Sequence, residues 1–134
     1  MTDADTAVSA PMRSAINWFE IPVRDLDRAQ RFYEALLGRP LRREPMGPSM
    51  TLAVFSYDEP GTGGALMAGP EVAPPSREGS IVYLDASPSL DAALERAHTL
   101  GATLLCPKIV LPGDMGAFAH IEDTEGNRVG LHAA

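Results

Sequence analysis

Hydrophobic and polar positions alternate along residues 16–23, and this period of two predicts a β-strand with two different faces. The apolar face consists of Phe19, Ile21 and Val23. The opposite face carries Trp18 and Glu20. If the apolar face packs against a helix, Trp18 and Glu20 face a different part of the molecule.

Apolar residues then recur at helical spacing, which predicts an amphipathic helix over residues 26–37. Its apolar face consists of Leu26, Ala29, Phe32, Tyr33, Leu36 and Leu37. Asp25 precedes the helix and can accept a hydrogen bond from its first turn. Gly38 follows the helix and can end it in the left-handed conformation. The unit is therefore one strand, a tight turn and one amphipathic helix.

Further apolar stretches predict strands at 40–46, 50–55 and 62–68. The proline-containing segment 70–78 is the best candidate for a linker. The opening pattern then returns, because residues 80–86 again predict a strand and a second amphipathic stretch follows it. The apolar stripe of this second helix consists of Leu90, Ala93, Leu94, Ala97 and Leu100.

Ser87 and Pro88 predict the N-cap and the first residue of the second helix, and Gly101 ends it. The dipeptide Leu26-Asp27 recurs as Leu90-Asp91 at an offset of 64 residues. This spacing indicates an internal repeat of one structural unit.

The second half ends in predicted strands at 103–110, 117–121 and 129–132. Pro107 interrupts the first of these, which predicts an edge strand. The fold class is therefore α+β, with two βαβββ modules at about 14–69 and 79–134. One helix cannot cover both faces of a sheet, so the uncovered faces must curl around the other half, a second subunit or a ligand.

The composition narrows the function classes. The chain has 134 residues and a formal charge of -7, which argues against nucleic acid and anionic membrane as partners. The single cysteine fits a reducing compartment, and no apolar run is long enough to cross a bilayer. Residues 1–13 lack the pattern of a signal peptide and predict a flexible tail. We expect a cytoplasmic protein.

Three motifs carry a resemblance to a known family. They are Ile21-Pro22-Val23-x-Asp25-Leu26-Asp27-Arg28-Ala29, Phe32-Tyr33-Glu34-x-Leu36-Leu37-Gly38 and Asp123-x-Glu125-Gly126-Asn127-Arg128-Val129. With the repeat, the chain resembles the vicinal oxygen chelate (VOC) superfamily, the group of glyoxalases, bleomycin-resistance proteins and extradiol dioxygenases. The resemblance implies paired modules whose mixed sheet curls around a cavity, and we expect a homodimer that completes this cavity.

Active members of this superfamily hold a divalent metal ion in the cavity. The resemblance places its four usual ligands at Trp18, within 64–67, at Val82 or Tyr83, and at Gly130. An indole N–H only donates hydrogen bonds, glycine has no side chain, and 64–67 contains neither histidine nor glutamate. We therefore expect no metal at the usual site and no other cofactor. A nonclassical site formed by Glu20, His120 and His132 remains open.

Five side chains are candidates for a ligand-binding site on the uncovered faces: Trp18, Glu20, Tyr83, His120 and His132. In one interpretation they bind a small, partly aromatic or carbonyl-containing molecule for sequestration or sensing. In the other, Glu20 and His120 act as acid and base in a lyase or isomerase, or an unusual metal site supports dioxygenase-like chemistry. In a purely structural interpretation, Glu20 pairs with a histidine or a backbone N–H and the cavity is only a remnant core.

Overall fold

The computed structural model describes residues 14–134; the predicted tail, residues 1–13, lies outside the described residues. The elements in chain order are β1 (Trp18–Pro22), α2 (Leu26–Leu37), β2 (Arg42–Met46), β3 (Met50–Val54), β4 (Gly63–Ala68), β5 (Tyr83–Asp85), α3 (Leu90–Thr99), β6 (Thr103–Val110), β7 (Ala117–Glu122) and β8 (Arg128–Ala133). Within the described range, no helix is long and apolar enough to span a membrane.

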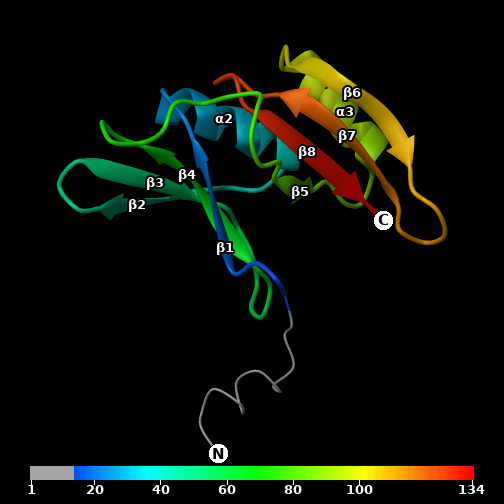
Figure 1. Cartoon of the computed structure of the whole chain (residues 1–134), viewed down its shortest axis with the longest axis horizontal. Helices are drawn as coiled ribbons and strands as arrows, with labels where there is room; N and C mark the ends of the chain where they lie inside the picture. Colours follow the sequence, from blue (N-terminus) through cyan, green and yellow to red (C-terminus); the bar gives the residue numbers. More distant parts are fainter. Residues whose placement is uncertain (1–13) are drawn as a thin grey trace, which may run out of the picture.

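The strands form two four-stranded sheets of matching topology, β1-β4-β3-β2 and β5-β8-β7-β6 (Figure 1). In each sheet the first strand pairs in parallel with the last, and the remaining pairs are antiparallel. The predicted pair of βαβββ modules is confirmed. Strand β6, which contains Pro107, lies at an edge as its proline predicts.

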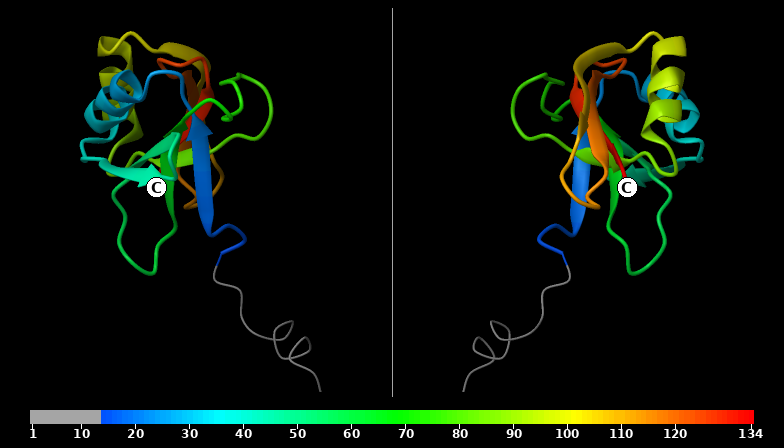
Figure 2. Two further views of the ribbon diagram at one scale, coloured as in Figure 1. Left: turned by 90° about the vertical axis from the view of Figure 1, so that its left-hand side faces the viewer. Right: turned by 90° about the vertical axis from the view of Figure 1, so that its right-hand side faces the viewer.

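Both helices lie on the same side of the two sheets (Figure 2). Helix α2 contacts α3, and one hydrophobic core runs through both modules. Among residues 14–134, the largest fully buried side chains are Tyr33, Leu36, Leu66, Ile121, Leu131 and Val129. Because the two helices cover only one side, each sheet keeps a second face without a helix, and we call these the open faces.

The predicted helix signals are confirmed for α2. The Asp25 carboxylate accepts the Arg28 backbone N–H at 3.0 Å, and Gly38 has a φ of 71°. The predicted start of α3 is wrong by two residues, because Ser89 rather than Ser87 is its N-cap.

The reason lies in the residues that precede α3. The Asp85 carboxylate accepts the Ser87 backbone N–H at 2.9 Å, which holds Ser87 in a turn before the helix. The hydroxyl of Ser89 then accepts the Ala92 backbone N–H at 3.1 Å. The local sequence offers two serines for the same role, and the turn at Asp85 selects the later one.

The turn between β7 and β8 fastens the second module to the first. One carboxylate oxygen of Glu125 accepts the backbone N–H groups of Arg24 and Asp25, both at 2.9 Å, and the other accepts Arg28 Nε at 2.8 Å. Burial alone would raise the pKa of Glu125, but the hydrogen bonds from Arg28 and the backbone lower it to about 2. The sequence predicts only the local turn here, and the structure adds this clasp between modules.

Candidate functional site

Trp18 and Glu20 lie on the open face of the first sheet, as the alternation along β1 predicts. Ile21 is 4% exposed and belongs to the core under the helices, whereas Trp18 packs on a separate apolar cluster. That cluster consists of Leu52, Val54, Ala65 and Met67. The Trp18 Nε1–H donates to Glu20 Oε2 at 3.3 Å, so the indole and the carboxylate form one polar and aromatic unit.

The open face of the second sheet carries a chain of three polar side chains. The Tyr83 hydroxyl lies 2.7 Å from His120 Nε2, and Arg128 Nη1 lies 3.1 Å from His120 Nδ1. A guanidinium only donates, so Nδ1 must accept, and we assign the proton of the neutral imidazole to Nε2. The Nε2–H then donates to the Tyr83 oxygen.

This assignment decides what Tyr83 can offer a ligand. Burial, and to a smaller extent the positive charge of Arg128, lowers the pKa of His120, so the neutral imidazole is favoured. Because the Tyr83 oxygen accepts from His120, its own O–H remains available to donate. Tyr83 is 48% exposed in the single chain, so this donor can reach a bound molecule.

Gly130 makes the contact between Tyr83 and His120 possible. It pairs with Tyr83 across β5 and β8 and with His120 across β8 and β7. A Cβ at Gly130 would lie 2.3 Å from Tyr83 Cδ1. Only glycine therefore leaves room for the phenol ring to lie over β8 at this position.

Phe118 extends this region as an aromatic surface. Its ring lies 5.6 Å from that of Tyr83 in a T-shaped arrangement and 5.5 Å from that of His120. The surface offers a flat ligand a stacking platform beside the Tyr83 hydroxyl.

His132 shares the open face but not the polar chain. It pairs with Phe118, and its Nε2 lies 2.7 Å from the Met115 carbonyl oxygen, to which it donates. Its Nε2 is therefore occupied by a loop of its own module.

Glu20 and Arg128 line the same small cavity, of about 140 Å³, between β1 and β8. Residues of the segment 74–82, which joins the two modules, also line it. The structure thus brings Trp18 to Glu20 and Tyr83 to His120. It records no hydrogen bond between Glu20 and His120 within residues 14–134, and none from either of them to His132.

Arg128 is the functional candidate that sequence reasoning missed. It was assigned only to the family motif, although it precedes Gly130 by two residues and therefore shares its face of β8. Alternation along β8 was the signal that could have found it.

The four positions of the usual metal ligands do not fit a metal ion. The Trp18 N–H already donates to Glu20, and an indole has no lone pair to give to a cation. Gly130 offers no side chain, and the Tyr83 ring lies across it. Within the part of the chain that the structure describes, no group of three or more His, Cys, Asp or Glu side chains is arranged to hold a metal.

Residues 15–131 match the family model of the Glyoxalase/Bleomycin resistance protein/Dioxygenase superfamily. The chain belongs to this superfamily. No curated protein matches this sequence significantly.

Solved structures with the same fold include proteins with different stated roles. A glyoxylase/bleomycin resistance protein/dioxygenase domain from Frankia sp. EAN1pec has 20% identity and a TM-score of 0.68, covering 92% of this chain and 99% of that one. TnmS3, an antibiotic binding protein from Streptomyces sp. CB03234, has 23% identity and a TM-score of 0.64, covering 92% and 98%. FosX, a fosfomycin resistance protein from Listeria monocytogenes, has 18% identity and a TM-score of 0.62, covering 92% and 93%. At these identities the likeness shows the fold alone.

Proposed function

We propose that this superfamily member binds a small, partly aromatic or carbonyl-containing molecule on its open faces without a metal ion. The observation that carries the proposal is the chain from Arg128 through His120 to Tyr83. It holds a neutral hydroxyl donor beside an aromatic surface, which suits a ligand carbonyl oxygen attached to a flat ring.

The missing metal ligands support binding rather than metal-dependent chemistry. A hard divalent cation exchanges its water shell only for several oxygen or nitrogen ligands, and Trp18 and Gly130 supply none. TnmS3, which has the same fold, is an antibiotic binding protein, and this supports sequestration of a toxic small molecule as one form of the proposed function.

The proposal includes a homodimer in the cytoplasm. In the single chain the open faces have no helix over them, and they expose Met46 of β2, Tyr83 of β5 and Ile109 of β6, which are 45%, 48% and 44% exposed. A second copy that covers these apolar residues would enclose the ligand and remove its apolar part from water. The single cysteine and the acidic charge fit a reducing, cytoplasmic environment.

A second candidate function is a lyase or isomerase, favoured by the position of Glu20 beside the cavity that Arg128 also lines. Glu20 as base and the Tyr83–His120 pair as acid would then act on opposite sides of a substrate. This differs from direct cooperation of Glu20 with His120, for which the structure records no contact.

A thermal-shift screen tests the proposal. The panel holds aromatic ketones, quinone antibiotics, bleomycin and fosfomycin, each assayed with EDTA and with added zinc or nickel. A ligand specific for the native state raises the melting temperature by mass action. We expect a shift in EDTA that is reduced in Tyr83→Phe and kept in the control Tyr57→Phe, which loses the same atom from another ring. No shift from any compound, or shifts only with added metal, would contradict the proposal.

Turnover distinguishes the second candidate. Each compound that binds is incubated with the protein and analysed by mass spectrometry. Unchanged ligand supports a binding protein, whereas product formation that is lost in Glu20→Gln supports the lyase or isomerase.

A further inference from the structure

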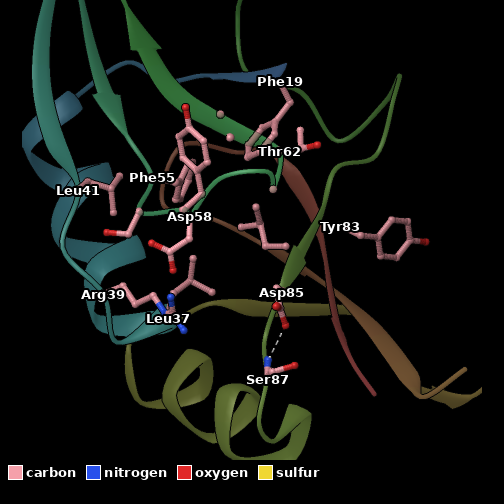
Figure 3. Close-up of a pocket in the computed structure, with 16 residues that line it drawn as sticks. Phe19, Leu37, Arg39, Leu41, Phe55, Asp58, Thr62, Tyr83, Asp85 and Ser87 are labelled. Carbon is pink, nitrogen blue, oxygen red and sulfur yellow. Dashed lines mark hydrogen bonds between the residues drawn. The ribbon is translucent and has the colours of Figure 1, made fainter. Parts of the chain in front are cut away.

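A second cavity, of about 350 Å³, opens on the helix side of the sheets. Its walls are the end of α2, the connection between β3 and β4, and the segment from β5 to α3. Figure 3 shows the Tyr83 ring pointing away from it, although the backbone of β5 borders it. The cavity is therefore separate from the open-face site.

The interior of this cavity is aromatic and apolar. The rings of Phe19 and Phe55 lie 5.6 Å apart, and Leu37, Leu41 and Leu84 complete the lining. A Cβ at Gly64 would lie 2.3 Å from the Phe19 ring, so this glycine lets the ring lie flat against β4. The volume is at the lower end of the range for small-molecule sites, about 300–1,000 Å³.

Charged side chains of both signs line this cavity, and Figure 3 shows Arg39 on one side and Asp85 on the other. Arg39 comes from the residue after the α2 cap, and Asp85 and Asp58 come from the two loop walls. The hydrogen bonds of Ser87 and, more weakly, the charge of Arg39 lower the pKa of Asp85. Within residues 14–134 the Arg39 guanidinium has no recorded ion pair or side-chain hydrogen bond, so its donors remain free for a ligand.

We propose that this cavity is a second small-molecule site that takes an α-amino acid with an apolar side chain. The ligand carboxylate accepts hydrogen bonds from Arg39, and the ammonium group faces Asp85. The side chain fills the space between Phe19, Phe55 and Leu84. A zwitterion uses both charged sides at once, whereas a ligand with a single charge leaves one side uncompensated.

Three related probes test this site on the full chain by NMR titration of the ¹⁵N-labelled protein. L-phenylalanine carries both charges, 3-phenylpropionate lacks the ammonium group and phenethylamine lacks the carboxylate. L-phenylalanine should shift the amide signals of Phe19, Gly64 and Leu84, and each single-charge probe should bind about tenfold more weakly.

Two arginine variants separate a specific site from general charge effects. Arg39→Gln should weaken L-phenylalanine binding about tenfold and abolish its advantage over phenethylamine. Arg31→Gln removes a charge from the exposed side of α2. It should change neither the affinity for L-phenylalanine nor the advantage of L-phenylalanine over phenethylamine. Tyr83→Phe should also leave this binding intact, which separates the result from the open-face site.

Three outcomes would overturn this inference: no shifts up to about 10 mM L-phenylalanine, shifts confined to the open faces, or equal effects of Arg39→Gln and Arg31→Gln.

Discussion

The Tyr83 hydroxyl lies 2.7 Å from His120 Nε2, and the opposite nitrogen of the same ring accepts from Arg128. One imidazole therefore links a fixed cation to a phenol, and its tautomer decides the direction of both hydrogen bonds. Three expected outcomes follow from this relationship and from the way the modules are joined, and two more follow from the proposed dimer and ligand.

Arg128→Met should raise the pKa of His120. Burial is the larger cause of the lowered value, so we expect only part of the shift to be reversed. The ¹⁵N chemical shifts of the imidazole, followed from pH 4 to pH 8, measure both the pKa and the tautomer. In the wild type they should show the Nε2–H tautomer; a proton on Nδ1 at neutral pH would contradict the assigned chain.

Gly130→Ala should disrupt the contact between Tyr83 and His120, because the new Cβ would meet the Tyr83 ring at 2.3 Å. Overpacking of this kind costs about 1–3 kcal/mol of unfolding free energy. In a Tyr83→Ala background the same substitution should cost much less, since the ring that it meets is gone. Urea unfolding of the four proteins measures this coupling, and additive costs would show that the ring does not lie across Gly130.

Glu125 should make the protein sensitive to acid. Its pKa is about 2 in the folded protein and near 4.5 in the unfolded chain. Above pH 4.5 the ionised carboxylate therefore makes its full contribution to the free energy of unfolding. That contribution, about 3 kcal/mol, falls as the pH drops from 4.5 towards 2 and is absent below pH 2.

Glu125→Gln should flatten this part of the stability profile and lower the unfolding free energy at pH 7. Glu95→Gln, at an exposed position on α3, should keep the wild-type profile. Chemical unfolding at a series of pH values compares the three proteins, and identical acid profiles would show that the clasp between modules adds no stability.

The proposed homodimer should have twice the mass of one chain by light scattering. Trp18 is the only tryptophan, so its emission reports on the open face. Dilution below the dissociation constant should shift this emission to longer wavelength, because dissociation exposes the indole to water. A single-chain mass at all concentrations would leave the open faces uncovered and contradict the dimer.

Local patterns in the sequence were sufficient for much of the fold. The alternation that separates Trp18 from Ile21 and the cap at Asp25 depend on neighbours within a few residues. The repeat of Leu26-Asp27 at Leu90-Asp91 shows that the same local pattern occurs twice. The modules and the helix start at Leu26 therefore follow from the sequence alone.

The sequence revealed less of the site because its contacts join distant residues. The hydrogen bond between Tyr83 and His120 spans 37 positions, and that from Arg24 to Glu125 spans 101. The positions implied by the family resemblance gave the candidates Tyr83 and His120 but not their partner Arg128, and Glu125 was assigned only to a turn. The start of α3 at Leu90 was missed because two serines compete as caps, and the turn at Asp85 decides between them.

The most direct test of metal-independent binding is a fluorescence titration. Protein stripped of metal with EDTA is titrated with the best ligand of the thermal-shift screen while Trp18 emission is recorded. We expect a saturable change with the same dissociation constant in EDTA and in zinc or nickel, and about tenfold weaker binding for Tyr83→Phe. A response that is absent in EDTA and restored by the metal would contradict the account.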